Sequence, residues 1–275
     1  MSLKLTFLGS GASLHSAERQ HVNLMLETKN EPTGDSCLLI DANGDTMRRI
    51  LKAGRDSTAL KHIFLTHDHQ DHILGLPDLI FQNVVKGHYG EAPHAPEINI
   101  YGLQSTLKTA QNLLEAGIYG PLSSKEKVTE ICSLKFHSLP NERSERNIGD
   151  FVVQSFPVEH DKKPCLGLRV AAKGSSKGMV YSADTSPCDN INEHLSPGDL
   201  LVHECYHHTI ETLPNHTTFF QIKRLAAGAW ADHSVYLVHM SPAMQMEESS
   251  LTRELDDLFG GRVQFAHDMQ SVKVA

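Results

Sequence analysis

The chain has 275 residues, of which 40% are hydrophobic and 21% are charged, a composition typical of a globular protein with a large core. Its formal net charge of −8 disfavours a protein that grips nucleic acid with its whole surface, and no run of about 18 apolar residues is present to span a membrane. The opening residues lack the basic start and the cleavage site of a signal peptide, so we expect a cytoplasmic protein with no membrane partner.

Hydrophobic periodicity predicts a β-rich N-terminal half in which several strands end at polar residues. The strand over 62–66 stops abruptly at a group of histidines and aspartates. The polar stretches 125–127 and 141–146 are expected to be solvated loops. Strands are predicted at 3–8, 22–27, 37–41, 62–66, 97–101, 130–136 and 151–156, and helices at 45–53, 74–85 and 103–116, the last ending at Gly117.

The second half shows the same mixture of strands and helices. Strands are predicted at 166–171, 178–182, 200–203, 234–239 and 262–266, with helices at 217–231, starting near His216 or Thr217, and at 247–258. Sheets interleaved with helices, without a strict βαβ repeat, predict an α+β fold in which two sheets face each other and helices cover both outsides. We therefore expect a four-layer αββα sandwich formed as one domain over 1–275.

Cysteine and histidine usage narrows the chemistry. The five cysteines are scattered and never form a Cys-x-x-Cys pair, which disfavours both a disulfide framework and a thiolate zinc site. The chain has 18 histidines but a single tryptophan. Because imidazole is the commonest metal ligand and titrates near neutral pH, the spacing of these histidines is the most informative feature of the sequence.

The segment T-H-D-H-Q-D-H directly follows the apolar strand 62–66. It places the side chains of His67, His69, Asp71 and His72 within one short loop. Alternate residues of such a loop project in different directions, so these side chains can reach two neighbouring positions in space. Divalent metals accept both imidazole nitrogen and carboxylate oxygen, so the loop predicts a site for two metal ions. The histidine-rich ligand set favours Zn²⁺, while the carboxylates also suit Mn²⁺ or Fe²⁺.

The pattern H-x-H-x-D-H after a strand resembles the signature of the metallo-β-lactamase superfamily, whose fold is an αββα sandwich with one or two metals at one edge. Three further segments resemble its remaining ligand motifs, F-P-V-E-H-D at His160, Y-S-A-D-T-S-P at Asp184 and Y-L-V-H-M-S-P at His239. The resemblance implies two divalent metal ions. One would be held by His67, His69 and His160, the second by Asp71, His72 and His239, with Asp184 bridging them.

Five other segments resemble the ribonuclease Z branch of that superfamily: T-F-L-G-S-G-A-S, H-I-L-G-L-P, S-A-D-T-S-P, the pair H-E-C and H-T-T, and F-A-H-D-M. This resemblance implies hydrolysis of phosphodiester bonds by a metal-bridged hydroxide. His216 would donate a proton to the leaving oxygen, Glu204 would orient His216, and Asp71 would serve as a ligand and as a base. It also implies a homodimer.

Two departures from that branch bear on the substrate. Ribonuclease Z usually carries a long arm for tRNA between the ligands that correspond to His160 and Asp184, but only 23 residues separate them here. The segment D-A-N-G-D at 41–45 also replaces the expected D-C-G-E. The predicted substrate is therefore a small nucleotide or cyclic phosphodiester, or an RNA 3′ end, and DNA is not expected.

Other interpretations remain open at this point. The same metal site could hydrolyse carboxylic esters, lactones, thioesters or sulfate esters, and a metal-holding protein without turnover is a lower-ranked hypothesis. Residues 86–96 are a candidate substrate-covering loop or a surface loop without a role. The charged residues 161–163 could meet an anionic substrate or form an ordinary turn.

Overall fold

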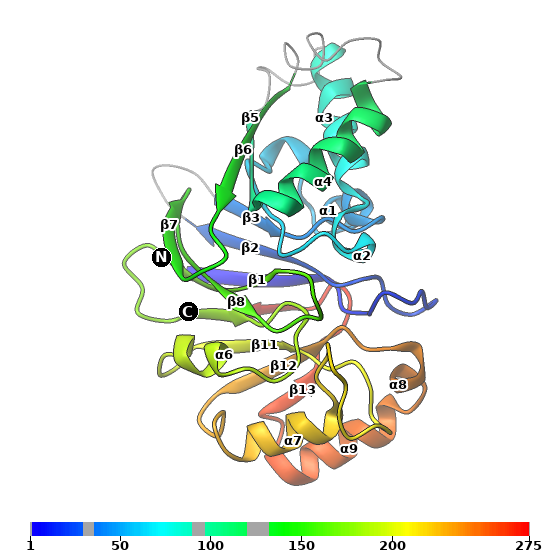
Figure 1. The fold of residues 1–275 in the computed structure, drawn as a ribbon, viewed down its shortest axis with the longest axis vertical. Coiled ribbons are helices and arrows are strands. Elements are labelled where there is room, and N and C mark those ends of the chain that lie inside the picture. Colours follow the sequence, from blue (N-terminus) through cyan, green and yellow to red (C-terminus); the bar gives the residue numbers. More distant parts are fainter. Residues whose placement is uncertain (1, 30–35, 90–96, 120–131, 275) are drawn as a thin grey trace.

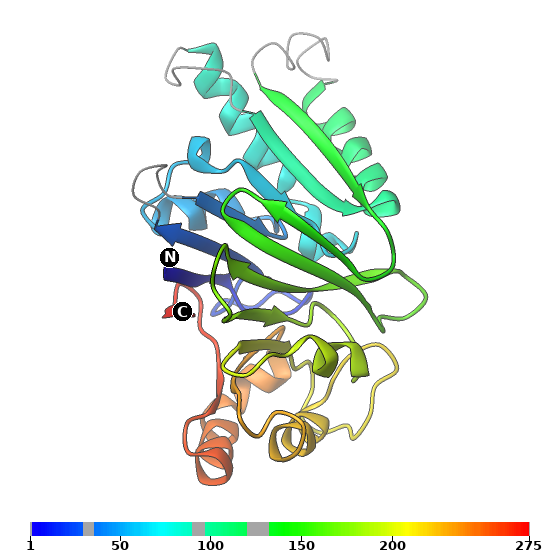
Figure 2. The same ribbon diagram turned by 90° about the vertical axis from the view of Figure 1, so that its left-hand side faces the viewer.

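The computed structural model describes residues 2–29, 36–89, 97–119 and 132–274, which form two facing sheets with helices on both outer sides (Figure 1). The strand order is β14-β1-β2-β3-β4-β5-β6 in one sheet and β13-β12-β11-β10-β9-β8-β7 in the other. This arrangement confirms the predicted α+β sandwich of four layers. The view at right angles shows the N- and C-terminal segments side by side, as the antiparallel pairing of β1 with β14 requires (Figure 2).

The first sheet combines an antiparallel half with a parallel half. Strands β1, β2 and β3 are antiparallel neighbours, whereas β3 to β6 run parallel, with Leu39 of β3 opposite Ile63 of β4. Its strands are β1 (Ser2–Gly9), β2 (Asn23–Lys29), β3 (Ser36–Ile40), β4 (His62–Phe64), β5 (Glu97–Leu103), β6 (Ser133–Leu139) and β14 (Ser271–Lys273). Its helical elements are α1 (Thr46–Lys52), η1 (Ser57–Ala59), α2 (Gln70–Ile73), α3 (Leu76–His88), α4 (Gln104–Leu114) and η2 (Glu115–Tyr119).

The second sheet is divided in the same way. Strands β7 to β10 are antiparallel neighbours, and β10 to β13 run parallel. Its strands are β7 (Ser144–Ile148), β8 (Phe151–Val158), β9 (Cys165–Ala172), β10 (Gly178–Tyr181), β11 (Leu200–Glu204), β12 (Ser234–Val238) and β13 (Val263–Phe265). Its helices are α6 (Asp189–His194), α7 (Phe219–Ala227), α8 (Pro242–Met246) and α9 (Glu248–Phe259).

Two hydrophobic clusters hold the layers together. One lies between the sheets, where Leu5 and Phe7 of β1 join Phe151 and Leu168 of the second sheet, and it continues beneath α7 and α9. The other packs α1, α3 and α4 on the first sheet, through residues such as Ile80. Burial of apolar side chains at roughly 25 cal/mol per Å² makes these clusters the main stabilising contribution, and they form a rigid frame for the loops at the sheet edges.

Several predicted boundaries are wrong. Gly117 does not end a helix, because the helical backbone continues through η2, and the missing Cβ instead lets Gly117 approach Pro77 of α3. The stretch 141–146 is not only a loop, since β7 begins at Ser144; an edge strand paired only with β8 can carry polar residues. The predicted helix 217–231 is shorter, starting after an N-cap at Thr218 and ending at Ala227. In the candidate loop 86–96, residues 86–88 are helical instead, because α3 extends to His88. Residues 90–96 and 125–127 lie outside the described residues.

The carboxyl ends of parallel strands bring the polar loops of both sheets together. The segment 67–72 follows β4, Asp184 follows β10, and His239 follows β12, while His160 follows the antiparallel strand β8. Three non-glycine residues at this edge have positive φ values, Asp41 at 64°, Ala183 at 52° and His239 at 59°. Such strained backbone is concentrated at functional sites, where the surrounding fold holds it in place.

Candidate metal centre

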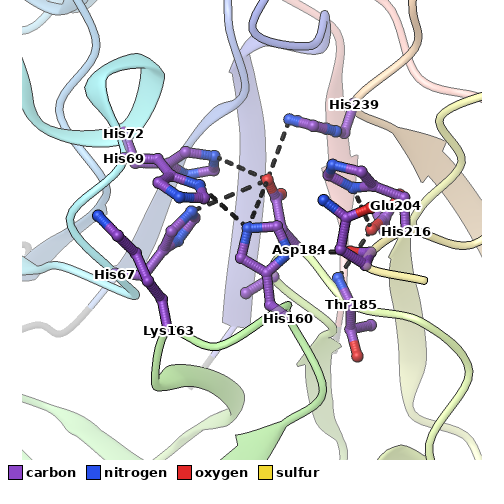
Figure 3. A network of polar contacts seen from close by, with 12 residues as sticks. His67, His69, His72, His160, Lys163, Asp184, Thr185, Glu204, His216 and His239 are labelled. Atoms are coloured by element: carbon purple, nitrogen blue, oxygen red, sulfur yellow. Dashed lines mark hydrogen bonds and ion pairs between the residues drawn. The ribbon is translucent and has the colours of Figure 1, made fainter. Parts of the chain in front are cut away.

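The seven predicted metal ligands lie in one cluster, contributed by four loops. Figure 3 labels all of them except Asp71. Asp184 is at its middle, with its Oδ2 atom 3.1 Å from His239 Nε2 and 3.4 Å from His72 Nε2. The Nε2 atoms of His67 and His160 lie at 3.8 Å and 4.0 Å from the same oxygen. The structure therefore brings together side chains that are up to 172 positions apart in the sequence.

The cluster divides into two sets of four that share Asp184. One set contains His67, His69, His160 and Asp184, the other Asp71, His72, Asp184 and His239, and within each set the ligand atoms lie within 4.8 Å of one another. This is the same division that the family resemblance implies. Asp184 is the residue common to both sets.

Atom spacing provides a test of whether these sets fit a metal. Four ligands placed tetrahedrally at the usual zinc distances are about 3.4 Å apart. In the second set the separations are 3.4 Å for Asp71–His72, 3.3 Å for Asp71–His239 and 3.1 Å for Asp184–His239. In the first set, His69 Nδ1 and His160 Nε2 are 3.0 Å apart. The spacings in the second set fit a divalent ion. In the first set the His69–His160 spacing is compatible with one, while His67 and His160 lie farther from Asp184, at 3.8 Å and 4.0 Å.

Unpartnered polar atoms point to the same conclusion. Among the described residues, the buried atoms His67 Nε2, His72 Nε2 and Asp184 Oδ1 make no hydrogen bond. A buried polar group without a partner costs about 1–3 kcal/mol, so three at one place call for a ligand. Imidazole nitrogens and a carboxylate oxygen are ligand atoms that divalent metals accept.

Neighbouring residues fix the direction of the ligand rings. His72 Nδ1 lies 2.7 Å from Asp41 Oδ2, and Asp41 also accepts a hydrogen bond from the backbone nitrogen of Thr66. His160 Nδ1 donates to the backbone oxygen of Asn215 over 2.8 Å. Both contacts leave Nε2 for the cluster, as is usual for metal-binding histidines. The role of Asp41 was not predicted, although its place at the end of β3, beside the ligand loop, was a usable signal.

The electrostatics of the cluster are those of closely packed opposite charges. Burial alone would lower the pKa of His72, but the carboxylates of Asp184, Asp71 and Asp41 hold that pKa well above its ordinary value. Burial would raise the pKa of Asp184, but His239 and His72 hold it well below its usual range. The pKa of His67 is lowered well below its ordinary value by burial and by the neighbouring His72. These shifts favour the metal-binding forms of Asp184 and His67, whereas His72 favours its protonated form and would release that proton on binding a metal.

Beside the cluster lies the predicted proton-donor pair. His216 Nδ1 and Glu204 Oε1 are 2.8 Å apart, and the backbone nitrogen of Thr185 donates to the same oxygen over 2.7 Å. Burial, followed by repulsion from Asp184, raises the pKa of Glu204 well above its ordinary value, while burial lowers the pKa of His216. A hydrogen bond therefore joins Nδ1 of His216 to Oε1 of Glu204, and Nε2 of His216 takes no part in that contact.

A pocket of about 470 Å³ opens next to His160. It is lined by polar groups from the loops that carry His160 and Asp184, among them Lys162, Lys163 and Ser186. Lys163 Nζ lies 3.1 Å from the carboxylate of Asp68, which ties it to the ligand loop. The volume is within the range of about 300–1,000 Å³ found for small-molecule sites.

A profile of the family described as Anti-Pycsar protein Apyc1 matches residues 3–257, so the chain belongs to this family. Among individual relatives, ribonuclease Z of Thermococcus kodakarensis is 26% identical over 304 aligned positions that include 90% of each chain. Because this alignment is longer than 275 residues, the relative contains segments with no counterpart here.

Solved structures agree on the fold. The metallo-β-lactamase fold protein YhfI from Bacillus subtilis is similar over 99% of this chain and 100% of its own, with a TM-score of 0.78 and 21% identity. The short form of human tRNase Z is similar over 99% of both chains, with a TM-score of 0.72 and 19% identity. These likenesses establish a metallo-β-lactamase fold, and the family implies bound divalent metal ions.

Proposed function

We propose that this chain is a metal-dependent phosphodiesterase that acts on small nucleotide or cyclic phosphodiesters. The observation that carries the proposal is the pair of four-ligand sets that share Asp184, with the Glu204–His216 pair beside them. The relatives named ribonuclease Z and tRNase Z support phosphodiester chemistry.

The residues proposed as metal ligands are His67, His69, Asp71, His72, His160, Asp184 and His239. When bound, two divalent cations supply Lewis acidity toward the phosphate oxygens and lower the pKa of water. We propose Zn²⁺ as the metal, since five of the seven ligands are histidines.

The chain's own groups then handle the proton and the substrate. His216 Nε2 would donate a proton to the departing oxygen, because an alkoxide leaves poorly without one. Glu204 would hold the His216 ring in place through Nδ1. Asp71, a ligand whose carboxylate lies at the cluster, would accept a proton from the attacking water.

The size of the substrate is inferred from the segment between His160 and Asp184. It contains only β9, β10 and their turns, with no projecting arm. The pocket beside His160 would receive a single nucleoside-sized substituent.

We extend the proposal to a cytoplasmic homodimer. Within the described part of the chain, no helix has the length and apolarity needed to cross a bilayer.

The test compares three substrates with protein loaded with Zn²⁺ or Mn²⁺: bis-p-nitrophenyl phosphate, a nucleoside 3′,5′-cyclic monophosphate and a 3′-extended precursor tRNA. We expect hydrolysis of both small diesters and no trimming of the tRNA. The Asp184→Ala variant should be inactive, whereas Asp189→Ala, which alters an exposed aspartate on α6, should match the unaltered chain. Trimming of tRNA would contradict the small-substrate assignment. Inertness toward all three, together with hydrolysis of an ester or lactone, would contradict phosphodiester chemistry.

A further inference from the structure

Tyr206 directly follows the segment H-E-C that carries Glu204, and nothing in the proposed mechanism uses it. Its ring stacks on that of His216, with centroids 4.6 Å apart and planes inclined by only 15°. The same ring lies 5.7 Å from His239, and His216 lies 5.2 Å from His239. The three rings thus form one compact group that includes His216 of the proton-donor pair and His239 of the metal centre.

The backbone of Tyr206 is fixed on both sides of this group. Its N–H donates to the oxygen of Thr217 over 3.0 Å, and its oxygen accepts from the nitrogen of Ser241 over 3.2 Å. Tyr206 therefore joins the segment that carries His216 to the segment that follows His239. These two hydrogen bonds fix the backbone from which the Tyr206 ring projects, and a change of the side chain would leave them in place.

The hydrogen bond to Glu204 fixes one nitrogen of His216 but not the tilt of the ring about that bond. His216 is on an irregular segment before α7, and its side chain is 13% exposed. A flat aromatic surface against its face removes this remaining freedom, because nearly parallel rings at this spacing attract each other and exclude water. The direction of Nε2 then depends on Tyr206.

We infer that Tyr206 is a positioning residue, whose aromatic ring aligns His216 for proton donation to the leaving oxygen. The inference rests on the proposed function of His216. We assign this role to the ring and not to the hydroxyl, since it is the ring that lies against His216.

The test uses Tyr206→Phe, Tyr206→Leu and Tyr206→Ala, with Phe81→Ala as a control at an aromatic residue of α3 that is 38% exposed. On a nucleoside 3′,5′-cyclic monophosphate, we expect the Phe variant to stay within about threefold of the unaltered chain and the Leu and Ala variants to lose about tenfold or more in kcat, with little change in KM. On bis-p-nitrophenyl phosphate, whose leaving group needs no proton, all variants should stay within about threefold.

A double variant separates positioning from a general structural effect. Adding Tyr206→Ala to His216→Ala should cost no further activity, because the group that Tyr206 aligns is gone. Equal losses for the Phe and Ala variants would overturn the inference in favour of a hydroxyl role, and equal losses on both substrates would overturn it in favour of a structural one. If the unaltered chain hydrolyses both diesters but Tyr206→Ala matches it, only the inference fails. If the unaltered chain hydrolyses neither, the proposed function fails with it.

Discussion

The metal cluster and the Glu204–His216 pair lie side by side, but their polar atoms differ in whether the chain itself supplies their partners. In the cluster, buried nitrogens of His67 and His72 have no hydrogen-bond partner within the described chain. In the pair, His216 Nδ1 meets Glu204 Oε1 at 2.8 Å and Tyr206 covers the ring. The proposed ions would therefore complete the cluster, whereas contacts within the chain already orient the pair. Changes in the two regions should have separable consequences.

The largest effect is expected at Asp184, where the two ligand sets meet. Asp184→Ala removes the shared carboxylate and leaves His67, His72 and His239 without its negative charge. We expect a loss of at least about 1,000-fold in kcat on every diester, and fewer than two metal ions per chain by elemental analysis. The exposed Asp189→Ala serves as the control. Full turnover with two ions bound to Asp184→Ala would eliminate the bridging assignment.

His216→Ala should produce a selective loss. A proton donor contributes about 10²–10⁴-fold, so turnover of a cyclic nucleotide should fall within that range. Turnover of bis-p-nitrophenyl phosphate should change less than about threefold, and the metal content should remain at two ions. This outcome would sharpen the contrast between the two regions. A parallel loss on both substrates would mean that His216 belongs functionally to the metal cluster.

Asp41→Asn should affect metal binding more than proton donation. Asp41 holds His72 through Nδ1 at 2.7 Å, and residues in this position typically contribute 10–100-fold in metal affinity. We expect the dissociation constant for Zn²⁺, measured by competition with a chelator, to rise by that factor, with kcat recovered at saturating metal. Asp45→Asn, which alters an ion pair to Arg49 on α1, is the matched control. Unchanged metal affinity in Asp41→Asn would remove Asp41 from the site.

The sequence predicted those parts of the site that follow directly from strand ends. Apolar strands directly precede the ligand loop after β4 and the polar residues after β10 and β12. We could therefore expect these residues to meet at one edge of the sheets. Asp41 and Tyr206 were missed, because their contacts depend on the register of β3 against β4 and on the path of the chain between β11 and α7. Neither is visible in local periodicity.

The missed secondary structure has a similar explanation. β7 and β14 are edge strands that pair on one side only, so they need no alternating apolar pattern. α6 has six residues, too few to show a helical period. Long buried strands such as β8 and β9 were predicted nearly in full because each carries a strong apolar signal.

The smallest effect is expected at two helix N-caps, one near the Glu204–His216 pair and the other near the metal cluster. Thr218 caps α7 two residues after His216, in a capping box with Gln221, and Ser241 caps α8 two residues after His239. Replacing either with Ala should lower the free energy of unfolding by about 1 kcal/mol, measured with denaturant. The two changes are matched in chemistry and in distance from the site.

Their functional consequences should nevertheless differ. Thr218→Ala loosens the segment that carries His216, so kcat on a cyclic nucleotide should fall a few-fold while the affinity for Zn²⁺ is unchanged. Ser241→Ala loosens the segment after His239, so the affinity for Zn²⁺ should fall a few-fold, with kcat at saturating metal unchanged. If each variant instead changes both the affinity for Zn²⁺ and kcat on the cyclic nucleotide, the metal cluster and the Glu204–His216 pair act as one cooperative unit. The contacts of the Tyr206 ring with His216 and His239 would then couple the two regions.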